Sequence, residues 1–405
     1  MRSIVSRAAQ HPVTANGIKI VGLIPGTGYG DQACEVAAGL DAKGIDVSWL
    51  PTVDDTADVM PLARAMEDAP SAIASRLEPL WNSDVEASAL FVQVPPYRWH
   101  AHWREAEPGL RHYCYLPWEV DKIPPDWIAP LNGYDKVLVP TQFNRKAFLE
   151  GGVTTEIVVS PHFPRLIVPG GDVLALDGIR EHDYVFYTIG AWTSRKDIAA
   201  TARAYLNAFT ADDDVVLVIK TESYDQIAYQ NASRELRGGG TRRRLTTAWT
   251  LATILAGYKN PARINLISNK VSPGQIDQLH LRGQCFVSLT HSEGWGLGAF
   301  DAARSGNPVI ITGWGGQLEY LGEEYPFLVD YTLEQTAQYV SDGYFYQAPD
   351  VHWAHANDSH ASELMRSVYE GRSAATVIGT ALKATLEVRY NTDTLATELA
   401  ATLGF

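Results

Sequence analysis

The chain has 405 residues, of which 46% are hydrophobic and 20% are charged, and its formal net charge is −14 at pH 7. This length exceeds one ordinary hydrophobic core, so two domains are expected. The acidic balance argues against a nucleic-acid-binding protein, because neutralising phosphates requires a basic face. Three widely spaced cysteines, Cys34, Cys114 and Cys285, support neither a disulfide framework nor a zinc site. Without a recognisable signal peptide or membrane-spanning run, we expect a cytoplasmic protein with at most peripheral membrane contact.

The first half of the chain alternates short apolar runs with helical stretches. A strand at 18–24 leads into a glycine turn at 25–30, a helix at 31–43 and a second strand at 46–50. Further strands are predicted at 89–93, 113–116, 136–140 and 156–159. Strands that alternate with helices predict a doubly wound parallel sheet.

A stretch rich in proline and glycine, 166–182, is typical of a linker and divides the chain. The linker is followed by a second α/β series, with strands predicted at 184–189, 215–219, 264–267, 285–289 and 309–312. We therefore predict two Rossmann-like domains, 1–165 and 183–380, that face each other across a cleft. The tail at 381–405 is predicted to be helical, with the N-terminal domain as a candidate surface for it to pack on. Ligands of such sheets bind outside the carboxyl ends of the strands, which places the site in the cleft.

The strongest signal is a glycine loop between the strand at 285–289 and the helix that follows it. Bare backbone at a helix start can approach a ligand closely, and its free N–H groups favour an anion. The carboxylates of Glu293 and Asp301 lie on either side of this loop and can accept hydrogen bonds from vicinal hydroxyl groups. The alternative to a binding site is that Glu293 is an ordinary charged residue of a loop and Asp301 an ordinary acid near the start of a helix. The pattern predicts a sugar-nucleotide site, with donor contacts from Asp301 and from the loop residues Gly294, Trp295, Gly296, Leu297 and Gly298.

Cations follow the first two strands of the second domain. Arg195 and Lys196 come after the strand at 184–189, and Lys220 ends the strand at 215–219. All three are predicted to face the cleft. There the planar guanidinium of the arginine and the ammonium groups of the two lysines can neutralise a diphosphate. Ordinary surface lysines remain the alternative. An arginine-rich stretch at 234–244 is predicted to be a solvated loop, with an anion site as the other possibility.

The first domain offers weaker signals. Gly26 and Gly28 resemble a dinucleotide-binding turn, but the second strand ends at 49–52 without the acid that would bind an NAD ribose. We predict instead that the turn admits donor phosphates or the acceptor. The aromatic segment at 94–119 suits a sugar ring, and its candidates for an acceptor or sugar contact are His112, Trp118 and Glu119. His100 and His102 lack a third ligand at useful spacing, so no metal site is predicted.

Together these motifs resemble the GT-B-fold retaining glycosyltransferases, in particular glycosyltransferase family 4. The family's paired-acid motif, Glu followed after seven residues by Glu, is present as Glu293 and Asp301, with a shorter second acid. The segments 195–197, 302–310 and 315–316 also fit, and 116–127 and 139–144 are similar to a bacterial subgroup. Two departures stand out. The family often has an arginine where this chain has Ala191, and Gly-x-Gly-Pro where it has 220–222.

The resemblance implies a retaining hexosyltransferase that moves a sugar from a nucleoside diphosphate, most often UDP or GDP, to an acceptor hydroxyl. Glu293 would contact the transferred sugar, Asp301 the ribose and Lys196 the diphosphate, with Lys220 as replacement for the missing cation. Neither a cofactor nor a metal is implied. The acceptor would be a sugar, a glycoconjugate or a lipid-linked sugar, as in polysaccharide or glycoconjugate biosynthesis. A nucleotide-sugar epimerase or hydrolase and a non-catalytic sugar-binding relative remain as alternatives.

Overall fold

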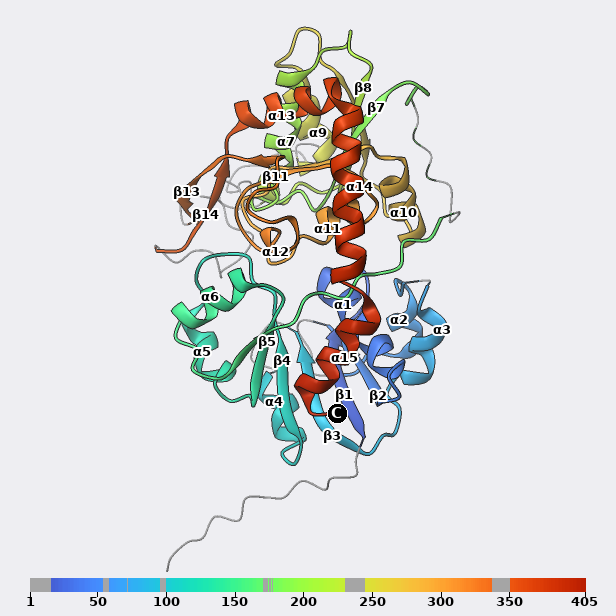
Figure 1. Ribbon diagram of the computed structural model, residues 1–405, viewed down its shortest axis with the longest axis vertical. Helices are drawn as coiled ribbons and strands as arrows, with labels where there is room; N and C mark the ends of the chain where they lie inside the picture. The colour runs from blue at the N-terminus through green and yellow to red at the C-terminus, as the bar shows by residue number, and fades with distance from the viewer. Residues whose placement is uncertain are drawn as a thin grey trace, which may run out of the picture.

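The computed structural model describes residues 16–53, 58–70, 72–94, 100–169, 174, 176, 178–229, 245–336 and 350–405. The arginine-rich stretch at 234–244 and the part of the aromatic segment at 95–99 lie outside these ranges, and the side chain of His100 is also not described. The described chain forms two α/β domains stacked along the long axis of the molecule (Figure 1).

The first domain contains a parallel six-stranded sheet in the order β2-β1-β3-β4-β5-β6. Its strands are β1 (Gly17–Leu23), β2 (Asp46–Thr52), β3 (Ala87–Gln93), β4 (Arg111–Tyr115), β5 (Lys136–Val139) and β6 (Ile157–Val159). All six strands predicted in this half are confirmed, with ends shifted by one or two residues. They were recognisable because a parallel strand covered on both faces is apolar along its whole length.

Helices cover both faces of this sheet, which is what doubly wound means. They are α1 (Gly28–Asp41), α2 (Leu62–Met66), α3 (Ala74–Leu77), α4 (His100–Ala106), α5 (Ile128–Leu131) and α6 (Gln142–Glu150), with short 3-10 turns at Glu78–Leu80 and Pro125–Trp127. Alternate side chains of β3 enter different cores. Phe91 joins the core that includes α1, whereas Leu90 packs in the core that includes Phe148 of α6.

The second domain repeats this plan, with the strand order β12-β11-β10-β7-β8-β9. Its strands are β7 (Tyr184–Ile189), β8 (Val215–Lys220), β9 (Arg263–Ile267), β10 (Cys285–Ser288), β11 (Val309–Thr312) and β12 (Leu328–Val329). Its helices are α7 (Ile198–Ala208), α9 (Thr247–Leu255), α10 (Pro273–Arg282), α11 (Leu297–Arg304), α12 (Leu318–Leu321) and α13 (Asp358–Glu370). The five predicted strands are present, but β12 was missed because two residues cannot display a pattern.

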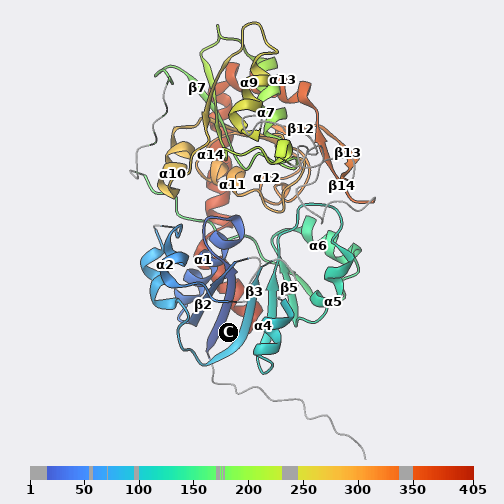
Figure 2. The same cartoon turned by 180° about the vertical axis from the view of Figure 1, so that it is seen from behind.

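A separate antiparallel pair, β13 (Tyr331–Gln335) and β14 (His352–Ala356), extends from the second domain toward the first, as Figure 2 shows from behind. At its inner end the Nδ1 atom of His352 lies 3.0 Å from a carboxylate oxygen of Asp121 in the first domain. This pair was not predicted, because neither Tyr-Thr-Leu-Glu-Gln at 331–335 nor His-Trp-Ala-His-Ala at 352–356 is a continuous apolar run.

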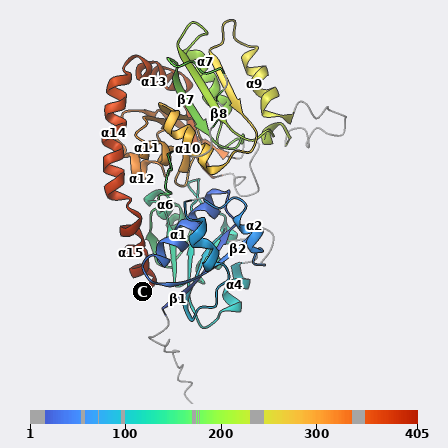
Figure 3. The same cartoon turned by 90° about the vertical axis from the view of Figure 1, so that its right-hand side faces the viewer.

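Two long helices close the chain and join the domains. α14 (Arg372–Arg389) packs along the second domain, and α15 (Thr392–Leu403) lies against α1 of the first, as the side view of Figure 3 shows. Arg111 and Tyr113 of β4 both donate hydrogen bonds to the carbonyl oxygen of Leu403, at 2.7 and 3.1 Å. The predicted tail boundary at 380 falls inside α14, which is one continuous helix. Within the described ranges, no helix combines the length and the apolar character needed to cross a membrane.

Gly379 in α14 gives a test of the packing between this helix and the sheet domain. Alanine normally stabilises a helix by about 1 kcal/mol relative to glycine. Here a methyl group would overlap the backbone carbonyl of Gly306, which follows α11. We therefore expect Gly379→Ala to lower the melting temperature, whereas Thr380→Ala on the exposed face of the same helix should leave it unchanged or raise it slightly. Thermal unfolding of both variants measures the difference, and equal midpoints would contradict close packing here.

Candidate functional site

The glycine loop of the second domain lies directly against the first domain. Gly296 has a φ of +85° and is the residue before α11, so this turn requires glycine. A side chain on Gly294 would come within 3.0 Å of the backbone N and O atoms of Trp118. One on Gly28 would lie 3.2 Å from Leu297. The carboxyl ends of the two sheets therefore face each other, with glycines at the closest approach.

A buried cluster of charges lies at this contact. The carboxylate of Glu293, 7% exposed, is 2.5 Å from the Lys196 ammonium and 3.2 Å from the Arg195 guanidinium. Arg195 also donates to the carbonyl oxygen of Ser292 at 2.8 Å and lies 3.6 Å from Glu119 of the first domain. Three second-domain side chains and one first-domain acid thus meet in one place.

Mutual charge compensation sets the protonation states in this cluster. Burial alone would raise the pKa of Glu293, but the neighbouring ammonium and guanidinium outweigh it, so the pKa lies below its ordinary value. Burial lowers the pKa of Lys196, an effect that Arg195 reinforces and Glu293 opposes. The result is an ionised carboxylate held by two cations in a site with little water around it.

Asp197 fixes the direction of Lys196. Its backbone is in the left-handed region, with a φ of +35°, which is unfavourable for a residue other than glycine. The side chain compensates by capping α7, since it accepts a hydrogen bond from the amide of Ala200 at 3.0 Å. Its other oxygen lies 3.5 Å from Nε2 of His291, which itself stacks on Trp353. The sharp turn places the Lys196 side chain beside the glycine loop.

The second acid of the motif is also buried and paired. Asp301 is 4% exposed and accepts a hydrogen bond from Nε of Arg165 at 2.5 Å. Arg165 belongs to the segment that joins the two sheets, and its guanidinium also binds Asp277 of α10. Burial by itself would lower the pKa of Arg165, but the two carboxylates more than offset it, so its pKa is raised. Asp301 is therefore tied to the interdomain connection.

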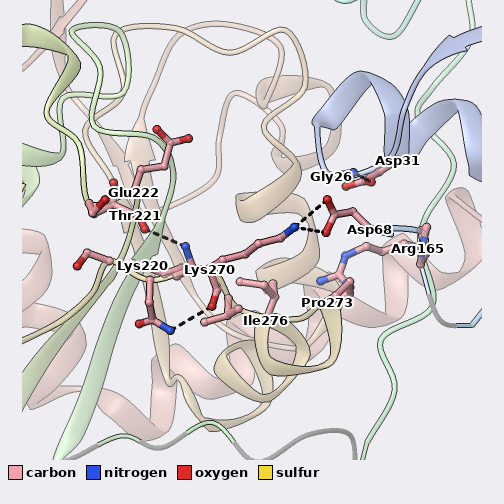
Figure 4. Close-up of a pocket in the computed structure, with 15 residues that line it drawn as sticks. Gly26, Asp31, Asp68, Arg165, Lys220, Thr221, Glu222, Lys270, Pro273 and Ile276 are labelled. Atoms are coloured by element: carbon pink, nitrogen blue, oxygen red, sulfur yellow. Dashed lines mark hydrogen bonds and ion pairs between the residues drawn. The ribbon is translucent and has the colours of Figure 1, made fainter. Parts of the chain in front are cut away.

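A cavity of about 500 Å³ opens between the domains next to Arg165 (Figure 4). The second domain lines it with the ends of β8 and β9 and the start of α10, and the first domain contributes Gly26, Asp31 and Asp68. Lys270 spans the gap and reaches Asp68 at 2.7 Å. Lys220 donates to the carbonyl oxygen of Thr221 at 2.9 Å, and burial lowers the pKa of its ammonium. Two lysines and several backbone groups thus border one chamber.

A smaller cavity of about 180 Å³ adjoins it and shares Asp31, Arg165 and Ile276. Residues of α1 and α11 face each other across this space, with Glu35 on one side and Asp301 on the other. Burial raises the pKa of Glu35 to about 8, and Asp31 beside it has a pKa of about 6 for the same reason. Buried acids of both domains therefore meet at this smaller cavity.

The structure brings together only some of the residues predicted from the sequence. Glu293, Arg195, Lys196 and Glu119 form one cluster. Lys220 and Gly26 line the larger cavity, while Asp301, Leu297 and Gly298 line the smaller one. Gly28 lies in the first turn of α1, and Gly294 and Gly296 shape the loop beside Glu293.

Three aromatic or imidazole side chains are placed differently from the expectation. Trp295, 2% exposed, packs among aromatic rings of the second-domain core. Trp118, 3% exposed, donates its indole N–H to the backbone carbonyl oxygen of Lys122. Both serve as apolar anchors on either side of the interface. His112 lies near the amino end of β4, bonded through Nε2 to the carbonyl oxygen of Glu107. It is at the edge of the sheet remote from the cleft, because strand direction fixes which end faces the ligand.

Sequence reasoning missed several residues that line the cavities. Arg165, Asp68, Lys270 and Glu35 come from four segments far apart in the chain. The sequence offers one signal for Arg165, which is the one arginine in the otherwise apolar and proline-rich stretch 161–169. A cation in such surroundings needs an acidic partner if it is buried.

One group of described residues has the geometry for a metal ion. His182, Asp183 and Asp214 have ligand atoms within 4.8 Å of one another. They lie at the amino ends of β7 and β8, at the opposite edge of the sheet from the glycine loop, so this group is not part of the cleft. The carboxylate of Asp183 already accepts hydrogen bonds from Arg180 and Arg263.

Comparison with known proteins identifies the architecture. Among solved structures, HepE from Anabaena, in complex with UDP and glucose, superposes with a TM-score of 0.60 at 13% identity, over 96% of this chain and 99% of that one. The E. coli trehalose-6-phosphate structure bound with UDP-2-fluoro glucose has a TM-score of 0.61 at 12% identity, over 96% and 98%. The fold is GT-B.

A third structure matches over less of its length. S. aureus TarM, in complex with fondaparinux, α-GlcNAc-glycerol and UDP, gives a TM-score of 0.51 at 12% identity, over 78% of this chain and 55% of that one. No protein-family model and no curated protein sequence matches the chain. At these identities the likeness establishes the GT-B architecture alone.

The raised pKa of Glu35 predicts a pH-dependent stability. The unfolded chain releases this proton near pH 4.5, while the folded chain, where Glu35 faces Asp31, Arg165, Asp301 and Arg304, holds it up to about pH 8. Stability is therefore lost as the pH rises between these values. We expect Glu35→Gln to match the wild type at pH 4.5 and to raise the melting temperature by ~2 °C or more at pH 8.5. A constant difference at all pH values would contradict a buried, protonated Glu35.

Proposed function

We propose that this protein is a retaining glycosyltransferase that moves a sugar from a nucleoside diphosphate to an acceptor hydroxyl. The proposal rests above all on the buried group formed by Glu293, Lys196 and Arg195 at the carboxyl edge of the second sheet. This group offers a carboxylate that can accept hydrogen bonds from sugar hydroxyls, and two cations that can bind phosphate. Both lie beside a glycine loop, and a sugar diphosphate requires this combination. The sequence motif from Glu293 to Asp301 further supports placing the chain in glycosyltransferase family 4.

In this proposal the diphosphate lies at the start of α11. Amides of Leu297 and Gly298 and the positive end of the helix dipole would bind its oxygens. Lys196 has three donor protons, so it can share its ammonium between Glu293 and a phosphate. Together with Arg195 it would stabilise the charge that develops on the departing diphosphate, the term that is usually largest in such catalysis.

Glu293 would hold a hydroxyl group of the transferred sugar, and the leaving diphosphate would take the proton of the incoming acceptor on the same face. Such a step retains the anomeric configuration without a covalent protein intermediate. Its other requirement is positioning of donor and acceptor between the two domains. Protein cations perform the neutralisation here, so we propose that the reaction needs no metal ion.

The larger cavity would take the base of the nucleotide. Lys220 and the loop at 268–271 border it. HepE and TarM were both captured with UDP, which supports a UDP sugar as the donor of this protein. Residues 183–380 would then hold the donor, and 1–165 would face the acceptor, a sugar, a glycoconjugate or a lipid-linked sugar.

A thermal-shift series tests the donor site. We expect UDP to raise the melting temperature more than GDP, dTDP or ADP, with the same shift in the presence of EDTA. At 100 times its dissociation constant a ligand stabilises by about 2.7 kcal/mol, or ~3 °C for a chain of this size. If no nucleotide shifts the midpoint, the proposed function is wrong; a shift abolished by EDTA would contradict the metal-independent site.

Variants of the charged cluster test the chemistry. We expect Lys196→Ala and Glu293→Gln each to lower the rate of UDP release from a UDP sugar by about 10²–10³-fold, because each removes a contact to charge or hydroxyl in the transition state. Lys220→Ala should weaken UDP binding as strongly as Lys196→Ala. The matched control is Lys383→Ala, a lysine of α14 outside the cleft whose side chain is 42% exposed. Full activity in Lys196→Ala would exclude the proposed role, and unchanged UDP affinity in Lys220→Ala would remove Lys220 from the site.

A further inference from the structure

The smaller cavity between α1 and α11 contains buried polar atoms without partners. Nε2 of Gln32, Oε1 of Glu35 and Nη2 of Arg165 have no hydrogen bond to any part of the chain that the structure describes. Gln32 is 2% exposed and Glu35 is 7% exposed, and both line this cavity. Leaving such a group unpaired costs about 1–3 kcal/mol. Three such unpaired atoms around the smaller cavity indicate a bound group that forms hydrogen bonds with them.

The charges around the cavity disfavour an anion as occupant. Asp31 and Asp301 line it directly, and Arg165 is already shared between Asp301 and Asp277. The remaining titratable neighbours are His280, whose pKa burial lowers to about 4, and Glu35, protonated at neutral pH. A neutral group is therefore favoured, and hydroxyls suit it because each can both donate to an acid and accept from an amide or guanidinium.

The walls and size of the cavity restrict this group further. Phe163, Ile189 and Leu297 supply apolar surface between the polar atoms. The volume of about 180 Å³ corresponds to about six water molecules in liquid water, so it admits one small ring. Because Asp31, Arg165 and Ile276 also line the larger cavity, one ligand can extend through both.

We propose that Gln32 and Glu35 of α1, in the first domain, bind hydroxyl groups of the donor ribose in this cavity, opposite Asp301, which the resemblance already implies as a ribose contact. This rests on the proposed function and adds two nucleotide-binding residues from the first domain. Arg165 contributes its unpaired N–H from the segment between the sheets. The ribose is then held by both domains at once, so donor affinity depends on the contact between α1 and α11.

Deoxyribose analogues give a direct test. Dissociation constants for UDP, 2′-deoxy-UDP and 3′-deoxy-UDP are measured by calorimetry on the wild-type chain and on Gln32→Met, Glu35→Met and Glu35→Gln. A site that hydrogen-bonds a hydroxyl rejects the analogue without it, so the wild type should prefer UDP over at least one analogue by about tenfold or more. Gln32→Met or Glu35→Met should reduce that preference toward unity.

Two controls accompany the series. Glu35→Gln keeps a neutral hydrogen-bonding group of the same shape and should retain the preference, and Gln142→Met on the exposed start of α6 should behave as the wild type. Melting temperatures identify variants that fail to fold, and the analogue comparison on the wild type requires no variant at all.

The possible outcomes distinguish failure of this ribose proposal from failure of the proposed glycosyltransferase function. Wild-type protein that binds UDP and both deoxy analogues equally overturns the ribose assignment but leaves the glycosyltransferase proposal in place. An unchanged preference in folded Gln32→Met and Glu35→Met overturns the roles of these two residues. Absence of UDP binding to the wild type overturns both proposals.

Discussion

Neutralisation of one buried carboxylate shapes the whole interface between the domains. Glu293 lies where the two sheets meet, and an unpaired charge in that position would be strongly destabilising. Lys196 and Arg195 compensate it, and each needs its own support. Arg195 is oriented by the carbonyl of Ser292 and by Glu119 across the cleft, and Lys196 by the strained turn at Asp197. The glycines nearby allow the backbones to approach closely enough for these contacts.

A second tie runs through the connection between the sheets. Arg165 joins α10 and α11 of the second domain through Asp277 and Asp301, while its own carbonyl oxygen accepts a hydrogen bond from Arg304. Partly exposed pairs such as Lys270 with Asp68 add less, because solvent screens them. The two domains are thus held at their facing edges by buried groups, and on the outside by α14 and α15.

The sequence predicts the sheets well, because eleven of the twelve parallel strands, all but β12, are apolar runs that need no tertiary information. The order along the chain also places Glu293 and Lys196 in the loops that follow β10 and β7, at the carboxyl edge of the second sheet. The sequence fails where geometry depends on the path of distant segments. Nothing local indicates that Glu35 would face α11, or that Arg165, just before the linker, would reach Asp301. The sequence also does not show that Trp118 and Trp295 are buried among other aromatic rings, because an aromatic residue beside a site pattern can equally belong to the core.

Charge pairing also separates two kinds of cation in the cleft. Arg165 is bound by two carboxylates, so it carries little net charge toward a ligand and suits neutral hydroxyl groups. Lys220 is different: within the described ranges its ammonium binds a backbone carbonyl and no carboxylate. Arg195 and Lys196 both pair with Glu293, and Glu119 lies 3.6 Å from Arg195. The least compensated positive charge among these cations is therefore that of Lys220. An anionic diphosphate would be drawn toward it, which leaves the acid-rich cavity beside α1 to the uncharged part of the same ligand.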